Sequence, residues 1–383
     1  MLLQWLSKLE PVHRAATPED REAVCRFRYK VYIEELKYNH PAADHERKRL
    51  WEPEDDAAES TILYTGTLAD MTSTIRFTVW PPGKVPPEYF HKLSLELFPG
   101  IERLGVSYIG RLMIRRTLRG GIILPSLLRV GYEYMAGQAG ADLGFVACVP
   151  GLVRHYRRLG AVPYAGRLVD MGFALGIPLL LPMSDAEHLR RLGSPVASLV
   201  KKYYGRGKRP AVDMAPYRHL ISGEELPVEF DSEKVWQELQ EQLVAEGGGA
   251  SFLDGLPPKT AKRLASSGFL LTFGVGDMVT KEGIDEREAY VVLDGAFEIL
   301  RGGRRVGLLE KGDLFGEVAF FTEAGKRTAS VRALTPGRVL VLRRRFLEQL
   351  AAEDAEAAYQ VLLNMSRAMA ERLASIVRGG EEA

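Results

Sequence analysis

The sequence predicts an α+β protein of two domains, in which an α/β domain precedes a β-roll (jelly-roll-like) domain that ends in a long helix. A chain of 383 residues is long for a single core. Helical and strand periodicities mix as far as residue 205, whereas residues 251–350 show short apolar runs separated by glycine turns at spacings of about eight to twelve residues. Residues 206–250 open with Arg-Gly-Lys-Arg-Pro and end at a run of three glycines, which indicates a connector. We therefore expect domains at 1–205 and 251–383.

The composition excludes several classes of protein. The 51 Lys and Arg nearly balance the 50 Asp and Glu, so no global charge favours nucleic acid or an anionic membrane. Cys25 and Cys148 cannot form a disulfide framework or a metal cluster, and no metal site is predicted. The first ten residues lack a basic segment and a cleavage site, and read as a short amphipathic helix rather than a secretion signal. The apolar stretch Phe173–Met183 is too short to span a bilayer, so we expect a cytoplasmic protein.

The stretch GDLFGEVAFFTEAGKRTASV, residues 312–331, has the features of a phosphate-binding loop. A short helical turn beginning near Gly316 offers free N–H groups and a positive dipole end to a phosphate, and the glycine permits close approach. Glu317 can accept hydrogen bonds from ribose hydroxyls, and Arg327 can pair with the remaining phosphate charge. These residues together predict a site for a phosphorylated nucleoside.

Residues 251–377 resemble the cyclic-nucleotide-binding domain of catabolite-activator-type regulators, cyclic-nucleotide-dependent kinases and gated channels. The resemblance rests on this loop, on Phe273–Asp277 and on Ala289–Gly295. It implies that Glu317 binds the ribose 2′-hydroxyl and that Arg327 pairs with the cyclic phosphate, which Thr328 also contacts. The predicted nucleotide-binding residues are Phe315, Gly316, Glu317, Val318, Arg327 and Thr328.

The ligand expected from this resemblance is cAMP, or cGMP if Thr328 bonds the exocyclic amine of guanine. The alternative is a purely structural β-roll. A helix over Ala355–Val377, with Asp354 as its N-cap, would close over the base. Its apolar stripe of Leu362, Met365, Met369, Leu373 and Ile376 suits either a lid on the roll or a homodimer contact.

The N-terminal domain contains a strand, a basic glycine loop and a helix in succession. The strand is Val106–Ile114, and the helix is Ile122–Gly137. The loop between them can receive a pyrophosphate on its backbone N–H groups with arginine charge nearby. The residues expected at this binding loop are Met113, Arg115, Arg116, Arg119, Gly120 and Gly121.

A second strand, Leu143–Cys148, is followed by a helix that carries Tyr156 and ends at a Leu-Gly turn. This order resembles the acyl-donor core of the GNAT acyltransferase superfamily. The opening helix, Phe27–Leu36, resembles the autoinducer-synthase and N-acyl-amino-acid-synthase branch, as do the acidic residues 54–56. The branch has an acidic-x-Ser-Arg motif in which Arg111 matches here, whereas Tyr108 and Gly110 replace the acid and the serine.

The chemistry implied is attack of an amine on a thioester. A backbone N–H near Met113 would polarise the carbonyl, and the predicted catalytic residues are Arg111 and Tyr156, the latter protonating the departing thiolate. The base stays open among Asp55, His91 and Glu102.

The donor could be acyl-CoA or acyl carrier protein, because the arginines near the expected donor site suit CoA phosphates and an acidic carrier equally. These arginines are Arg115, Arg116, Arg119, Arg154, Arg157 and Arg158. The hypothesis is a cyclic-nucleotide-regulated N-acyltransferase. The rivals are a cyclic-nucleotide-regulated protein lysine acetyltransferase and a non-catalytic sensor with a GNAT-like fold.

Overall fold

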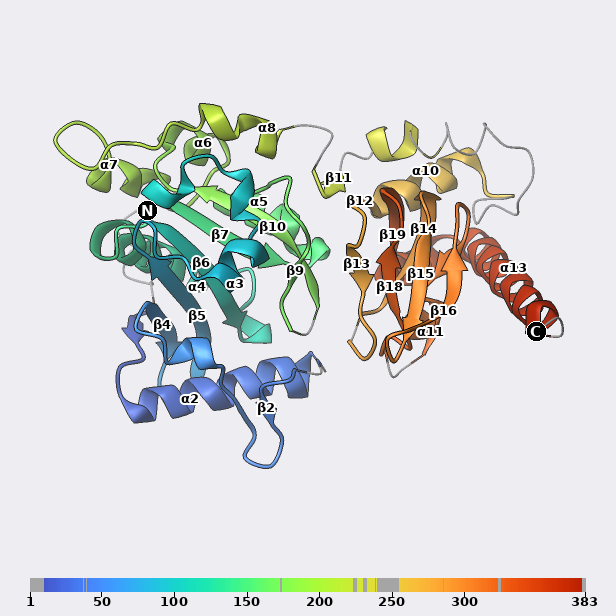
Figure 1. Cartoon of the computed structure of the whole chain (residues 1–383). Coiled ribbons are helices and arrows are strands. Elements are labelled where there is room, and N and C mark those ends of the chain that lie inside the picture. Colours follow the sequence, from blue (N-terminus) through green and yellow to red (C-terminus); the bar gives the residue numbers. More distant parts are fainter. Residues whose placement is uncertain are drawn as a thin grey trace. The chain divides into compact units, whose positions relative to one another are not determined.

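The computed structural model divides the chain into two compact units, Met1–Leu226 and Pro227–Ala383 (Figure 1). The division falls inside the segment that the sequence indicates as a connector. The structure describes residues 10–380 except 37, 39, 173, 223–225, 230–232, 238, 240–254, 285 and 323–324. The amphipathic segment expected before residue 10, and most of the polar stretch expected at 232–245, therefore lie outside the described residues.

The first unit is built on an eight-stranded sheet flanked by helices (Figure 1). Its strands run in the order β1-β4-β5-β6-β7-β10-β8, with β9 on the other side of β10. They are β1 Val12–Arg14, β4 Ser60–Gly66, β5 Met71–Trp80, β6 Val106–Ile114, β7 Leu143–Cys148, β8 Val162–Pro163, β9 Val169–Asp170 and β10 Leu175–Pro182, beside a small hairpin of β2 Ala43–Asp44 and β3 Arg49–Leu50. The predicted strands at 106–114 and 143–148 are confirmed.

The helices of this unit are α2 Pro18–Tyr29, α3 Pro87–Lys92, α4 Ile123–Tyr132, α5 Val153–Leu159, α6 Ala186–Arg191, α7 Val200–Tyr203 and α8 Arg218–Ile221. Thr17 and Asp20 form a capping box at the start of α2. This helix continues as a π-helical turn over Lys30–Glu35, so the predicted helix at 27–36 is the second half of a longer one. The predicted helix at 122–137 is confirmed as α4 and a π-helical turn over Glu133–Gln138.

Strand β6 contains a bulge at the centre of the sheet. Its register against β5 passes from Gly110 opposite Arg76 to Met113 opposite Thr74, so β6 has one residue more than its partner. Arg111, within the bulge, has a φ of 53°, which is unusual for a residue with a side chain. The β6–β7 pair is the parallel pair of this sheet, and its register ends at Ile109 and Val146, just before the bulge. The two strands are therefore no longer paired where the bulge begins.

Residues 206–222 pack on the rest of the first unit. Arg209 donates to the carbonyls of Ala136 and Gly140 and pairs with Asp142. Tyr217 is buried and donates to the carbonyl of Pro99 at 2.8 Å. This part of the expected connector is thus fixed to the unit that precedes it.

The second unit is a roll of two antiparallel sheets, ordered β11-β12-β19-β14-β17 and β13-β18-β15-β16. The strands are β11 Val228–Glu229, β12 Phe269–Phe273, β13 Met278–Thr280, β14 Glu288–Asp294, β15 Phe297–Arg301, β16 Arg304–Leu309, β17 Leu314–Phe315, β18 Ser330–Ala333 and β19 Gly337–Arg343. The helices are α10 Pro258–Ser267, α11 Glu317–Phe321, α12 Arg344–Glu353 and α13 Ala355–Gly380.

The expected β-roll and its terminal helix are confirmed. The Asp354 side chain accepts from the backbone N–H of Ala357 at 3.0 Å, as an N-cap does. Met365 is buried against the roll and Met369 is partly buried there, whereas Leu362 is 38% exposed, so the described members of the apolar stripe differ in burial. No helix in the described parts of the chain is both long and apolar enough to cross a bilayer.

Candidate functional site

The loop predicted to bind phosphate is assembled around a buried arginine. Arg327 is 4% exposed, and its Nη1 donates to the carbonyl of Gly316 at 3.0 Å. Gly316 has a φ of 79°, and a Cβ there would lie 2.3 Å from this Nη1, so the sequence requires glycine at this point. Glu317, the first residue of α11, directly follows Gly316, whose carbonyl accepts from Arg327. The two predicted residues therefore lie on the same loop.

A second carboxylate, which the sequence analysis missed, lies beside Arg327. Glu286 accepts from Arg327 Nε at 3.4 Å and from Thr280 Oγ1 at 2.9 Å. The Arg327 guanidinium also lies 4.9 Å from the centre of the Tyr290 ring. Its Nη2 is buried and has no hydrogen-bond partner among the described residues. A phosphate oxygen at this position would satisfy that donor.

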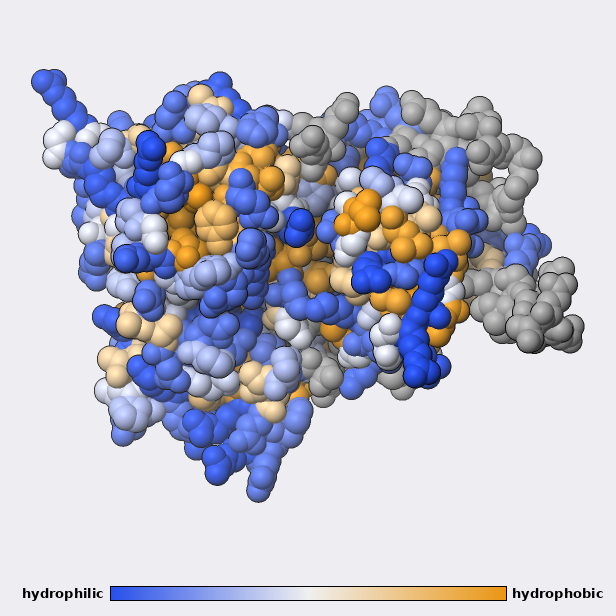
Figure 2. Space-filling model, viewed as in Figure 1, coloured by the Kyte–Doolittle hydropathy of each residue, from blue (hydrophilic) through white to orange (hydrophobic). Residues whose placement is uncertain are grey.

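The remaining predicted nucleotide-binding residues differ in exposure. Phe315 is buried and stacks on Tyr290 with ring centres 4.9 Å apart. Val318 is 42% exposed, and Thr328 is also exposed. Apolar side chains are visible on the surface of the second unit (Figure 2), and its exposed large apolar residues include Val275, Val306, Leu308, Val318 and Phe321.

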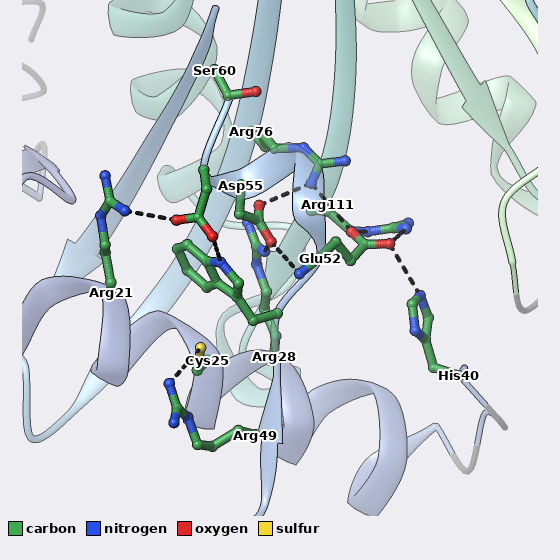
Figure 3. Close-up of polar contacts among 12 residues, drawn as sticks. Arg21, Cys25, Arg28, His40, Arg49, Glu52, Asp55, Ser60, Arg76 and Arg111 are labelled. Atoms are coloured by element: carbon green, nitrogen blue, oxygen red, sulfur yellow. Dashed lines mark hydrogen bonds and ion pairs between the residues drawn. The ribbon is translucent and has the colours of Figure 1, made fainter. Parts of the chain in front are cut away.

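In the first unit, a cluster of buried charges surrounds Arg111 (Figure 3). Arg111 Nε and Nη2 both donate to the carboxylate of Glu52. Glu52 also pairs with Arg76 at 3.3 Å and lies 3.5 Å from the imidazole of His40. Asp55 pairs with Arg76 at 2.9 Å and with Arg28 at 2.7 Å. The cluster joins the opening helix, the 52–55 turn and the central strands β5 and β6.

Burial and charge together set the protonation states in this cluster. Burial raises the pKa of Glu52, but its bond to Arg111 and the nearby arginine charges outweigh burial and lower it to about 2. The pKa of His40 is lowered to about 4, first by burial and then by the charge of Arg111, so the ring is neutral at pH 7. Asp55 likewise has a lowered pKa, because the attraction of Arg28 and Arg76 outweighs its burial. Glu52 and Asp55 are therefore ionised partners of arginines.

A polar cleft of about 460 Å³ opens beside this cluster. The acidic residues in its wall are Glu52, Glu54 and Asp170, and the basic ones are His40, Arg76, Lys92 and Arg111, together with Tyr108. Lys92 lies over two rings, with Nζ 5.3 Å from the centre of Tyr89 and 5.7 Å from that of Tyr108. A small polar or zwitterionic molecule matches these walls.

An apolar cavity lies on the other face of β6. Ile109 and Leu112 line it, whereas Tyr108 and Arg111 line the polar cleft, so alternate residues of the bulged strand serve the two hollows. Tyr156 of α5 also lines the apolar cavity, and burial raises the pKa of its phenol. Tyr156 therefore stays protonated at neutral pH and can act as a proton donor.

The residues expected at the donor loop fall into two groups. Arg115 pairs with Asp70 at 2.5 Å, and Arg119 pairs with Glu35 at 2.5 Å, so both are already engaged. Arg116, Arg154, Arg157 and Arg158 are exposed, and in the described part of the chain they have no ion-pair partner. Met113 is buried, and Gly120 has a φ of 82° with open space around its Cα.

The three residues left open as the general base, Asp55, His91 and Glu102, do not lie in one site. Asp55 is paired with two arginines, whereas His91 and Glu102 are exposed and do not line the polar cleft. The sequence analysis missed Glu52, Arg76, His40 and Lys92. The sequence of β5 could have indicated Arg76, because it is the one charged residue in a ten-residue strand, and a charge that is buried needs a partner.

Two family models match separate parts of the chain. Residues 23–181 match the family model described as N-acyl amino acid synthase FeeM, and residues 270–354 match that of the cyclic nucleotide-binding domain. The chain joins an N-acyl amino acid synthase FeeM domain to a cyclic nucleotide-binding domain. The FeeM domain is of acyltransferase type, and it contains the Arg111 cluster, both hollows and Tyr156.

The curated proteins similar to the chain match it over short stretches. A cGMP-dependent protein kinase of Toxoplasma gondii is 29% identical over 133 residues, which are 34% of this chain and 12% of that protein. The human potassium/sodium hyperpolarization-activated cyclic nucleotide-gated channel 3 is 41% identical over 70 residues, 18% of this chain and 9% of the channel. The chain thus spans only about a tenth of the length of these relatives.

Solved structures similar to the chain include a putative cyclic nucleotide-binding protein from Geobacter metallireducens, with 22% identity and a TM-score of 0.29 over 32% of this chain and 91% of that one. The catabolite activator protein of Thermus thermophilus has 25% identity and a TM-score of 0.29, covering 34% and 61% of the two chains.

Proposed function

We propose that this protein transfers an acyl group from a thioester donor to the nitrogen of an amine, and that a cyclic nucleotide regulates the transfer. The observation that carries the first half is the bulge in β6, which separates a polar cleft from an apolar cavity at the point where β6 and β7 cease to pair. A thioester placed across the bulge would have its carbonyl beside the cleft and its first acyl carbons toward the apolar side, where the cavity of about 30 Å³ would have to widen to take a longer chain. The parallel β6–β7 pair within an antiparallel sheet supports a GNAT-like fold.

The chain's residues divide the chemistry between the two faces. Backbone N–H groups of the bulge, near Met113, would polarise the thioester carbonyl. Tyr156, kept protonated by its apolar surroundings, would protonate the departing thiolate. Arg111 is held by Glu52 and so contributes a fixed positive wall to the cleft rather than a mobile group.

For the donor we favour an acyl carrier protein over acyl-CoA. Exposed Leu118 and Leu152 lie on the donor loop and just before α5, among the four unpaired arginines described above. An apolar contact ringed by unpaired positive charge suits an acidic protein partner. The protein is placed in the cytoplasm, where such a carrier is available.

The regulatory ligand is proposed to be cAMP or cGMP, bound by Arg327 and Thr328 at the phosphate and by Glu317 at the ribose. The buried, incompletely bonded guanidinium of Arg327 supports this proposal. Nucleotide would change the rate of transfer by binding the active and inactive states with different affinities. A dimer through α13 is compatible with the 38% exposure of Leu362.

The double variant Arg157→Glu, Arg158→Glu tests both the activity and the donor. With palmitoyl-acyl carrier protein and the twenty protein amino acids as acceptors, we expect the full chain to form N-acyl products, and the variant to show a KM for the carrier about tenfold higher because two favourable charges are reversed. The rate with a palmitoyl thioester of N-acetylcysteamine should not change. Arg47→Glu, in the turn after β2, is the matched control. Absence of acylated product from every donor, palmitoyl-CoA included, would contradict the proposed function.

A further inference from the structure

In the wall of the polar cleft, Glu54 and Lys92 have no ion-pair partner within 4 Å among the described residues, although the charges of Glu54, Glu52 and Asp170 act on Lys92. Glu52 is bound by Arg111 and Arg76, and Asp170 accepts from the backbone N–H of Gly172 at 2.9 Å. Glu54 has no ion-pair partner among the described residues, and it accepts one hydrogen bond, from the hydroxyl of Tyr89 at 3.0 Å. Lys92, on the same helix as Tyr89, also has no ion-pair partner in the described part of the chain.

The positions of these two residues follow from local structure. Glu54 is the second residue of the 3₁₀ turn Pro53–Asp55. Glu52, which precedes this turn, and Asp55, which ends it, are both paired with buried arginines. The turn is therefore held at two points, and Glu54 between them is partly buried in the cleft wall. Lys92 is fixed by the rings of Tyr89 and Tyr108 beneath it, and burial, followed by the charge of Arg111, lowers its pKa.

We infer that Glu54 removes the proton of the acceptor amine and that Lys92 binds a carboxylate of the same acceptor. This assignment rests on the proposed acyl transfer; it names a base, and a residue that binds the carboxylate of the amino acid acceptor that the description of the matched family implies. A zwitterion such as an amino acid carries an ammonium and a carboxylate on the same carbon, and the cleft offers it a carboxylate, Glu54, and an ammonium, Lys92, that are not ion-paired among the described residues. Tyr89 is a positioning residue, because its hydroxyl orients the Glu54 carboxylate without reaching the substrate.

The reaction balances with the groups named. One proton passes from the ammonium to Glu54 and then to solvent. The amine nitrogen then bonds to the thioester carbon and the carbon–sulfur bond breaks. The second nitrogen proton leaves as the amide forms, and it replaces the proton that Tyr156 gives to the thiolate.

Glu54→Gln is the decisive variant, because glutamine keeps an oxygen that can accept from Tyr89 but cannot take up a proton. We expect kcat to fall about 100-fold at pH 7, the size typical of general base catalysis. Between pH 6 and 9 the variant rate should rise about tenfold per pH unit, since it depends on amine that solvent has already deprotonated, while the wild-type rate varies little. The other charged groups that line the cleft with Glu54 are Glu52, Arg76, Lys92, Arg111 and Asp170, and His40 lines it as a neutral ring in this pH range.

Three further variants separate catalysis from structure. Glu59→Gln, an exposed residue shortly after the same turn, is the control and should behave as wild type. Tyr89→Phe should lower kcat less than about fivefold. If it lowers kcat as much as Glu54→Gln does, Glu54 serves only to hold the tyrosine, and the inference is wrong. Lys92→Met should raise KM about tenfold for the best amino acid but not for its amide, which lacks the carboxylate.

The outcomes distinguish the inference from the proposed function. Wild-type turnover together with an equally active Glu54→Gln variant, or with a pH profile parallel to that of wild type, overturns the role of Glu54 and leaves the acyl transfer standing. An equal rise in KM for amino acid and amide overturns the role of Lys92. If wild type itself forms no product from any donor, the proposed function fails and this inference fails with it.

Discussion

Replacing Arg327 by alanine is expected to weaken cyclic nucleotide binding about 100-fold or more. The guanidinium is buried, stacks on Tyr290 and has an Nη2 without a hydrogen-bond partner among the described residues. Charge-assisted bonds to a phosphate in such a place are strong, and their loss cannot be replaced by water. Calorimetric titration with cAMP and with cGMP measures the effect directly.

The control for this variant is Arg332→Ala, which lies five residues further along the chain. Arg332 is an arginine of β18 whose side chain is 45% exposed and paired with Glu298, away from the loop, so its replacement should leave nucleotide affinity unchanged. Arg327→Lys and the melting temperatures of all variants show whether the loop still folds. Micromolar binding by a folded Arg327→Ala protein would contradict the assigned role.

Glu286→Gln should act in the opposite direction. Glu286 now accepts from Arg327 Nε, so it competes with the phosphate for the same cation. Removing its charge should raise the affinity for cyclic nucleotide about fivefold. A lower affinity would mean instead that Glu286 orients the arginine for the ligand.

The second large effect is expected from Glu52→Gln, on stability rather than on affinity. The change would leave Arg111, whose side chain is 12% exposed, without its counter-charge. Truncating one member of a buried pair costs about 3–5 kcal/mol. We therefore expect the free energy of unfolding to fall by about 3 kcal/mol at pH 7. We also expect no acyl transfer, because the wall of the polar cleft would lose its order together with Arg111. Glu34→Gln, which breaks an exposed pair with Lys48, should cost almost nothing.

The pH dependence of stability provides an independent check on this pair. The pKa of Glu52 falls from 4.5 to about 2 on folding, so its stabilisation is complete above pH 4.5 and disappears as the pH drops to about 2. His40, whose pKa is lowered from 6.5 to about 4, adds a separate loss of stability as the pH falls from 6.5 to about 4. In the Glu52→Gln variant, the loss of stability between pH 4.5 and about 2 should be absent. A variant as stable as wild type at pH 7 would contradict the account.

The sequence predicted those features that depend on local pattern. The strand Val106–Ile114, the glycine at 316 and the cap at Asp354 each follow from periodicity or from a backbone requirement, and the structure contains all three. The predicted basic donor loop is altered by partners distant in sequence, since Asp70 and Glu35 occupy Arg115 and Arg119. Their spacing along the chain gives no sign of these contacts.

The polar cleft was the part of the structure that the sequence predicted least well. Glu52, Arg76 and Arg111 come from a turn and two strands, and only sheet register brings them together. The sequence could not show which of the acidic residues 54–56 is available. Asp55 is ion-paired with two arginines, whereas Glu54 lines the cleft. Burial, and not composition, decides which carboxylate is free to react.

Turnover of the full chain with and without nucleotide tests the central claim most directly. Acyl transfer from palmitoyl-acyl carrier protein would be measured at saturating cAMP, at saturating cGMP and with neither, in wild type and in Arg327→Ala. The account predicts a rate that changes at least about fivefold with one nucleotide in wild type and not at all in the variant, as a coupling free energy between two sites requires. Equal wild-type rates under all three conditions would contradict regulation of the acyltransferase by its cyclic nucleotide-binding domain.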